Sequence, residues 1–190
     1  MKWNSKQKAI AVAGLVTPAL LILIGSRITG KRSHDNSNNS STYKPYQNLK
    51  AFLLMIQYSE GTIGMNAYRM LFGGQLFGDM RWHPNIAITK SGITSTAAGA
   101  YQILYRTWMS VQQTLPLPDF SPASQDRAAV ELIRRRGALE DVLAGRFATA
   151  VYKCRKEWAS LPGAGYGQGE RSYASLESMY RKAGGYLMAA

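Results

Sequence analysis

Residues 49–60 read LKAFLLMIQYSE, and this stretch decides the first element of the fold. Large apolar side chains recur in it at the three- and four-residue spacing of a helix that buries one face: Leu49, Phe52, Leu53 and Ile56. Gly61 follows directly and is typical of a helix end. We therefore expect a helix of about three turns that carries a lone acid, Glu60, to its C-terminal end.

The remainder of the chain combines a β-like region with helical segments. Residues 66–100 are rich in Gly, Ser, Thr and aromatic residues, and two short apolar runs flank Gly73 and Gly74 in YRMLFGGQLF, which indicates a hairpin. From residue 101 onward the helical period returns, and the pair SP at Ser121 is typical of a helix start. One helix, a small antiparallel β region and a helical bundle predict an α+β fold with a cleft between its two parts.

Two segments without a globular pattern precede this domain, which we expect to span residues 48–190. Within residues 1–30, the stretch 9–26 holds no charge and follows three lysines, which is typical of a signal anchor or a signal peptide. The residues that end this stretch match a cleavage site poorly, so an uncleaved anchor is the favoured interpretation. Residues 31–47 are rich in Ser and Asn and poor in aliphatic residues, so we expect a flexible polar linker.

The charge of the chain limits its partners. A net charge of +12, from 23 Lys and Arg against 11 Asp and Glu, suits an anionic partner such as nucleic acid, phospholipid or bacterial envelope polymer. Residues 1–50 carry eight of the basic residues and one acid, so much of the excess lies beside the apolar segment. Membrane topology explains that placement better than DNA binding does. We expect contact with a membrane through the N-terminal segment and no nucleic-acid partner.

The scarcity of cysteine and histidine limits the chemistry. Cys154 is the single cysteine, which excludes internal disulfides, CxxC redox pairs and Cys-based metal clusters. His34 and His83 lie in different regions, so neither a two-histidine metal site nor a Ser-His-Asp triad is easily built. We expect no metal and no cofactor.

Glu60 is the first candidate for catalysis. The C-terminal end of a helix disfavours a negative charge and apolar neighbours reduce hydration, so the pKa of its carboxyl should be raised. A carboxylic acid that is protonated near neutral pH is what a glycosidase uses to protonate a leaving sugar oxygen. The alternative interpretation is a solvated residue at a helix end.

Ordinary glycoside hydrolysis also requires a second carboxylate. Asp79 in the β region is the candidate, whereas Asp119 and Asp126 are typical of turn or helix-start residues. If only one carboxylate works, the same group must act first as acid and then as base, and the substrate must supply the nucleophile.

Two loops could form walls beside such an acid. STAAGAYQIL, residues 95–104, passes through small and hydroxyl residues into an expected helix near Tyr101, and its exposed backbone N–H groups suit N-acetyl and hydroxyl groups of a sugar. LPGAGYGQ, residues 161–168, surrounds Tyr166 with three glycines. It lacks GK[ST] and a preceding strand, so a tight loop that presents an aromatic residue is favoured over a phosphate cradle.

Ordered blocks across residues 49–185 resemble the phage lambda endolysin family, the lambda lysozymes. The blocks are AFLLMIQYSEGT, GGQLF, HP, STAAGAYQIL, DFSPASQD, RGAL and WASLPGAGYGQ. The resemblance implies a lysozyme-like fold with a saccharide cleft. It also implies a peptidoglycan lytic transglycosylase, which cleaves the β-1,4 bond between N-acetylmuramic acid and N-acetylglucosamine without water and leaves a 1,6-anhydromuramoyl end.

The resemblance also implies roles for single residues. Glu60 in SEGT matches the single catalytic acid and base of the family. Positions expected to line the sugar subsites are Ser59, Tyr101, Gln102, Tyr166 and Gln168. The partner is then the glycan strand of peptidoglycan, and we expect the enzyme to act as a monomer.

The chain departs from the family pattern at its N-terminus, where the apolar segment and linker are additions. They fit a signal-arrest-release endolysin, held at the host inner membrane with its catalytic domain in the periplasm, or an enzyme secreted to the periplasm. Two alternatives stay open. One is a hydrolytic muramidase that uses Asp79, and the other is a non-catalytic, membrane-tethered wall-binding protein.

Overall fold

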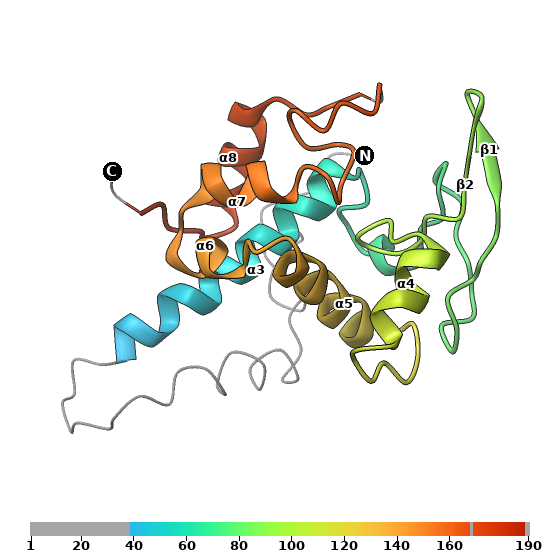
Figure 1. Cartoon of the computed structure of the whole chain (residues 1–190), viewed down its shortest axis with the longest axis horizontal. Coiled ribbons are helices and arrows are strands. Elements are labelled where there is room, and N and C mark those ends of the chain that lie inside the picture. The colour runs from blue at the N-terminus through green and yellow to red at the C-terminus, as the bar shows by residue number, and fades with distance from the viewer. Residues whose placement is uncertain (1–38, 168, 189–190) are drawn as a thin grey trace.

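The structure is a computed structural model that describes residues 39–167 and 169–188 (Figure 1). The helices are α3 (Asn39–Ser59), α4 (Tyr105–Gln112), α5 (Pro122–Arg135), α6 (Leu139–Ala144), α7 (Phe147–Cys154) and α8 (Tyr173–Lys182), with a 3-10 turn at Ala67–Arg69. The strands are β1 (Ile88–Lys90) and β2 (Ile93–Ser95), which pair antiparallel with Thr89 opposite Thr94. This mostly helical body with a small antiparallel sheet confirms the α+β prediction.

Helix α3 is the central element of the fold. Its residues from Asn48 to Gln57 are buried almost without interruption except at Lys50, and α6 and α8 pack against it (Figure 1). The Asn48 side chain ties three segments together, because its amide donates to Leu143 O at 3.1 Å and its Oδ1 accepts from Tyr186 N at 2.7 Å. The apolar face predicted from residues 49–56 therefore forms part of the hydrophobic core.

Helix α3 is longer than expected. It begins at Asn39, so residues 39–47, which were expected to belong to the flexible linker, are helical. Extending a helix that packing already holds costs less than nucleating a new one, which composition alone does not reveal. The chain end also covers this region, since the Lys44 ammonium lies 5.8 Å from the centroid of the Tyr186 ring.

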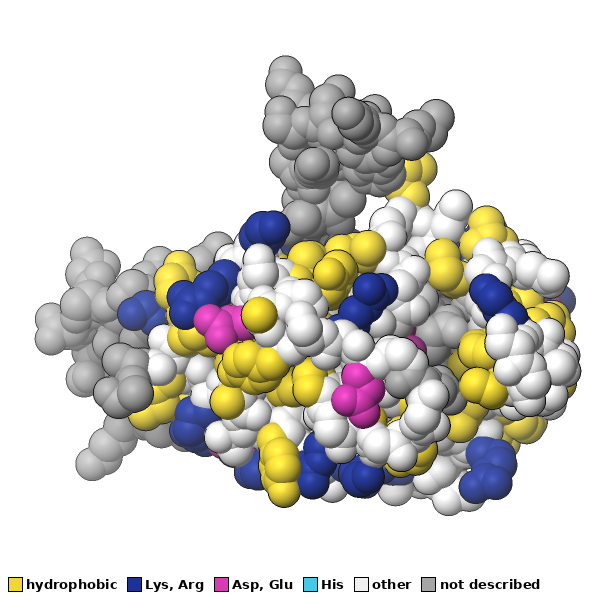
Figure 2. Space-filling model, turned by 90° about the horizontal axis from the view of Figure 1, so that it is seen from above, with side chains coloured by type: hydrophobic (Ala, Val, Ile, Leu, Met, Phe, Trp, Pro, Cys, Tyr) yellow, Lys and Arg dark blue, Asp and Glu magenta, His cyan; other side chains and the backbone are white. Residues whose placement is uncertain are grey.

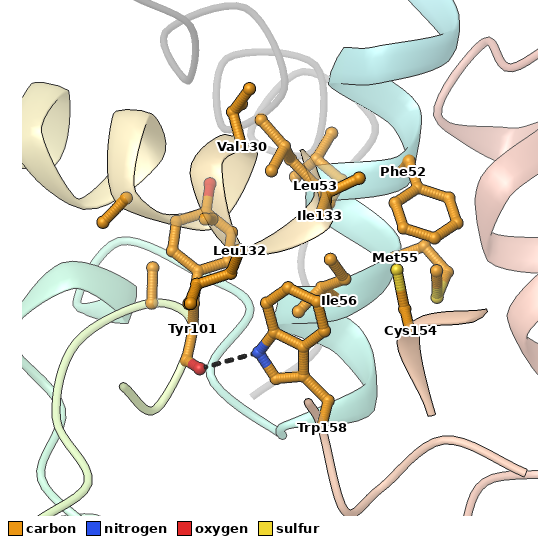
Figure 3. Close-up of a cluster of buried hydrophobic side chains, with 14 of the residues drawn as sticks. Phe52, Leu53, Met55, Ile56, Tyr101, Val130, Leu132, Ile133, Cys154 and Trp158 are labelled. Carbon is orange, nitrogen blue, oxygen red and sulfur yellow. Dashed lines mark hydrogen bonds between the residues drawn. The ribbon is translucent and has the colours of Figure 1, made fainter. Parts of the chain in front are cut away.

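Side chains from three parts of the chain meet in the core beside α3 (Figure 3). Ile56 on α3 and Ile133 on α5 are fully buried there, close to Tyr101 and Trp158. The indole Nε1 of Trp158 donates to the backbone oxygen of Tyr101 at 3.1 Å. This bond joins the segment before α4 to the segment after α7, and both segments border the cleft described below.

The β region differs in detail from its prediction. An isolated antiparallel bridge joins Met70 to Leu76 around the predicted Gly73–Gly74 turn, and the longer hairpin is β1–β2. Helix α4 begins at Tyr105 and not near residue 101, because Gln102 has a left-handed φ of 46° and the bridge between Ala98 and Ile103 holds this segment as a turn.

The N-terminal predictions fall mainly outside the described residues. The membrane segment expected at residues 1–30 lies outside them, as do residues 31–38 of the linker. Within residues 39–167 and 169–188, no helix combines the length and the apolar character needed to cross a membrane.

Candidate active site

A cavity of about 520 Å³ opens between the C-terminal end of α3, the turn at residues 70–74, the β1–β2 hairpin and the loop after α7. Its lining includes Ser59, Glu60, Lys90, Gln102 and Ser160. Glu60 is the only acidic residue among the described residues of this lining. Figure 2 shows the molecule from above, with Lys and Arg side chains spread over the visible face and few acidic ones. The cavity lining combines the Glu60 carboxyl and the Lys90 ammonium with hydroxyl and amide groups, so it suits a polar ligand.

The backbone fixes Glu60 at the point where α3 ends. Glu60 N donates the final helical hydrogen bond to Ile56 O at 3.0 Å, and Gly61 turns the chain with a φ of 71°. Thr62 Oγ1 then donates to Ala100 O at 2.6 Å, which anchors the SEGT turn to the opposite wall. The carboxyl therefore projects from a rigid helix end and not from a mobile loop.

The environment of Glu60 favours its protonated form. Burial raises the pKa of its carboxyl to about 7, although the hydrogen bond from Ser160 and the positive charge of Arg171 act in the opposite direction. Ser160 Oγ lies 2.6 Å from Glu60 Oε1, and the Arg171 guanidinium lies 5.2 Å from the centroid of the Tyr58 ring. The shift has the expected direction, and desolvation is its main cause. Such a carboxyl can give up and recover a proton near neutral pH.

Ser160 is a site residue that the sequence did not single out. Its hydroxyl contacts both Glu60 Oε1 and, at 2.9 Å, Ser59 Oγ, whose own hydrogen is donated to Ile56 O at 2.8 Å. The only signal for Ser160 in the sequence was its place inside the glycine-rich block WASLPGAGYGQ. The 100-residue separation from Glu60 closes only in the folded chain.

Comparisons with known proteins agree with this geometry. A sequence model of the family described as Endolysin matches residues 50–187. The chain belongs to the endolysin family. It is 45% identical to the endolysin of Escherichia phage P2, over 74% of this chain and 94% of that protein, and 43% identical to the endolysin of Escherichia phage lambda, over 72% and 90%.

Solved structures support the same assignment. Bacteriophage lambda lysozyme complexed with a chitohexasaccharide matches with a TM-score of 0.71 and 42% identity, covering 75% of this chain and 97% of that one. A second structure of lysozyme from bacteriophage lambda matches with a TM-score of 0.68 and 40% identity, and it covers 75% of this chain and 97% of that one. This endolysin is therefore a lysozyme-like enzyme that degrades peptidoglycan, and the resemblance seen in its sequence is confirmed.

The fold of the endolysin brings two of the predicted subsite residues to Glu60. Ser59 and Gln102 line the cavity. The Gln102 amide donates to Met70 O at 3.1 Å and to Gly99 O at 3.0 Å, so its orientation is fixed by the wall that it belongs to.

Tyr101 does not reach the cavity. It is 1% exposed, and its hydroxyl donates to Asp126 Oδ1 at 2.6 Å in the core. Tyr101 therefore lies in the core, whereas its neighbour Gln102 lines the cavity, and contact between Tyr101 and sugar stays a prediction.

Tyr166 and Asp79 are not among the residues that line the cavity. Tyr166 is 53% exposed and does not line the cavity, and its hydroxyl donates to Lys156 O at 3.3 Å. Gln168 lies outside the described residues. Asp79 also lies outside the cavity lining and pairs with Arg81 at 2.8 Å, which lowers the pKa of its carboxyl to about 2.

Asp119 and His83 make contacts within the fold. Asp119 precedes α5 and accepts hydrogen bonds from Ser121 N and Ser124 Oγ, as expected of a turn residue, while Ser121 is the N-cap of the helix. His83 is buried, with Nε2 2.9 Å from Ile103 O. Among the described residues, no group of three His, Cys, Asp or Glu side chains could hold a metal ion.

Proposed function

We propose that this endolysin is a lytic transglycosylase in which Glu60 serves as both acid and base. The observation that supports this most directly is that Glu60 is the sole acidic side chain in the described cavity lining. A hydrolase with two carboxylates would need a second one about 5 to 10 Å away across the bond that is cut. Asp79, the candidate for that role, is engaged by Arg81 outside the lining.

The reaction follows from a single carboxyl that exchanges its proton twice. Glu60 gives its proton to the glycosidic oxygen as the bond from that oxygen to C1 of N-acetylmuramic acid breaks. The Glu60 carboxylate then takes the proton of the muramoyl 6-hydroxyl as O6 bonds to C1. The products are a free N-acetylglucosamine hydroxyl and a 1,6-anhydromuramoyl end, no water is consumed, and Glu60 is protonated again.

The cavity contains groups suited to a glycan strand. A related solved protein, the lambda lysozyme, was complexed with a chitohexasaccharide, and we place the glycan strand of peptidoglycan in the corresponding cleft of this chain. Ser59 and the Gln102 amide supply polar contacts to sugar hydroxyl and N-acetyl groups. Lys90, at the end of β1, supplies a cation for the carboxylates that muramoyl substituents carry.

Mass spectrometry of digested peptidoglycan tests the reaction. Transglycosylation yields muropeptides that are one water, about 18 mass units, lighter than hydrolytic products, as the step above requires. Anhydro products from the wild-type enzyme support the proposal. Hydrolytic products alone contradict it and favour a muramidase, for which Asp79→Asn then tests the second carboxylate.

A non-catalytic wall-binding protein is separated from both enzymes by Glu60→Gln. The amide keeps the size of the side chain but cannot donate a carboxylic proton. Loss of peptidoglycan cleavage with retained binding to sedimented murein supports catalysis by Glu60. Equal cleavage by both forms contradicts it, and binding without cleavage by both forms favours the binding protein.

We also propose that the N-terminal segment holds the enzyme at the host inner membrane, with release into the periplasm to follow. The support is the uncharged stretch 9–26 with three lysines before it. Deletion of residues 1–26 should leave an enzyme that cleaves purified murein but does not lyse cells from within unless the membrane is opened artificially. Unaided lysis by the truncated chain would contradict this route. The same truncated enzyme should elute as a monomer in size-exclusion chromatography.

A further inference from the structure

The loop after α7 is closed on itself beside the active site. Arg171 N donates to Ser160 O at 2.8 Å, so the two ends of the segment 160–171 meet. Ser160, at one end, holds the hydrogen bond to Glu60 described above. The backbone bond from Arg171 thus connects this loop to the residue that contacts Glu60.

A carboxylate of the chain itself occupies the glycine-rich part of the loop. Glu170 Oε2 accepts from Gly163 N at 2.8 Å, and Glu170 Oε1 accepts from Gly165 N at 2.9 Å. Both glycines have a φ of 74°, a conformation that turns their N–H groups toward one point and that other residues rarely adopt. The stretch that resembles a phosphate cradle in sequence thus binds an internal anion.

A cation, Lys156, also holds the loop. Lys156 Nζ donates to Ala164 O at 2.8 Å, and the same ammonium lies 5.4 Å from the centroid of the Tyr166 ring. Lys156 is also the charged group that acts on Glu170, while Arg171 acts on Glu60. The Glu170 carboxylate accepts two charge-assisted hydrogen bonds, from the N–H groups of Gly163 and Gly165, and so links these two residues of the loop.

We propose that Glu170 is a positioning residue of the active site, whose carboxylate holds the 160–171 loop in the conformation that sets Ser160 on Glu60. The proposal rests on the proposed catalytic role of Glu60. In that reaction the Ser160 hydroxyl stabilises the carboxylate that forms when Glu60 has given up its proton. Without Glu170 the two glycine N–H groups lose their anion, the glycines regain conformational freedom and Ser160 leaves its place.

A double-mutant cycle on purified murein tests the proposal, with kcat and KM measured between pH 5 and pH 9. Glu170→Gln should lower kcat roughly tenfold with KM changed less than about twofold, because an amide offers one oxygen and turns an N–H group toward the other glycine. Ser160→Ala should have a similar effect. Both should move the ionisation of Glu60 in the pH profile upward, since both remove the hydrogen bond that favours the carboxylate.

The double variant distinguishes a linked role from general damage. If Glu170 acts through Ser160, the double variant should be no slower than the slower single variant by more than about twofold. Glu177→Gln on α8 removes another carboxylate, one paired with Arg181 at 2.9 Å, and should leave kcat, KM and the pH profile unchanged. Additive losses, or an unchanged kcat in Glu170→Gln, would overturn the proposal.

Two further controls keep the result interpretable. If Glu170→Gln lacks a cooperative thermal transition, Glu170→Asp replaces it, because its shorter carboxylate stays charged but reaches only one of the glycine N–H groups. A reduced kcat then supports the proposal and an unchanged kcat overturns it. The product masses of the wild-type enzyme report separately on transglycosylation, since a hydrolase that uses Glu60 as its acid would show the same coupling to Ser160.

Discussion

Two carboxyls of this endolysin share a raised pKa but differ in their access to the cavity and in their hydrogen-bond partners. Burial raises the pKa of Glu60 and of Asp126 to about 7. Glu60 ends a helix at a cavity and has one hydroxyl partner, Ser160. Asp126 lies inside α5, is fully buried, and accepts at one oxygen from two phenols, Tyr68 at 2.8 Å and Tyr101 at 2.6 Å.

The difference shows that a perturbed pKa does not by itself mark a catalytic group. Asp126 cannot meet a substrate, since two tyrosines and the helix around it separate it from solvent. Glu60 has the same protonation behaviour with an open side. Gln57 connects the two sites, because it lies one turn before Glu60 on α3 and donates to the Tyr101 hydroxyl at 3.3 Å. A carboxyl with a raised pKa is a candidate for catalysis only if substrate can reach it, as at Glu60, and otherwise has a structural role, as at Asp126.

The largest expected effect separates the two carboxyls by activity. Glu60→Gln should lower kcat on murein by at least about a thousandfold, because the sole proton donor is lost. Asp126→Asn should stay within about fivefold of wild type, since an amide oxygen can still accept from both phenols. Release of soluble muropeptides measures both rates, and circular dichroism checks that both variants are folded. A similar loss in both variants would remove the distinction.

The sequence predicted the position of Glu60 and placed Asp126 near a helix start, but it did not reveal the burial of Asp126. The helical period of residues 49–56 and the stop at Gly61 place Glu60 at a helix end, and both survive in the structure. Asp126 follows an N-cap and a proline, so local signals describe it as an ordinary helix-start residue. Its burial comes from Tyr68 and Tyr101, which no local pattern places beside α5.

The same limit explains the other differences. Ser160 and the Glu170 contact were missed because they depend on loop closure. Tyr101 was expected at the sugar subsites from the family resemblance, and local sequence did not reveal that its ring lies in the core. The extent of α3 was underestimated because a helix that packing holds over residues 48–57 propagates at low cost toward its N-terminus, and composition does not reveal this. Periodicity predicts elements well, and contacts between distant loops arise only from the assembled fold.

The second expected effect is a pH profile with one limb. Activity requires protonated Glu60 at the start of the reaction, so kcat/KM should fall about tenfold per pH unit above pH 7 and show no acidic limb from a second carboxylate. The Asp126→Asn variant should keep the same limb, because its carboxyl takes no part. Initial rates between pH 3 and pH 9 measure the profile. A bell shape with a second pKa between 4 and 5 would indicate a second catalytic carboxylate that must be ionised, and it would contradict the mechanism.

A third, smaller effect concerns stability. A carboxyl whose pKa is raised by folding stabilises the native state below its unfolded pKa, near 4, and loses that contribution as pH rises through 7. Glu60→Gln and Asp126→Asn should therefore each reduce the loss of stability between pH 5 and pH 8, by roughly 1 to 3 kcal/mol. Urea unfolding at the two pH values measures this. If both variants lose as much stability as wild type over this range, neither carboxyl is responsible for the pH dependence of the free energy of unfolding.

The smallest expected effect tests the boundary between the two regions at Tyr101. Tyr101→Phe removes one phenol donor from Asp126 and the acceptor of the Gln57 amide, so the free energy of unfolding should fall by about 1 to 2 kcal/mol. KM for murein should change less than about twofold, because the ring is buried and Gln102 is the residue of this turn that faces the cleft. Gln102→Ala should raise KM more than Tyr101→Phe does. If instead Tyr101→Phe raises KM and leaves stability intact, its hydroxyl reaches the sugar, and the core described around Asp126 opens during catalysis.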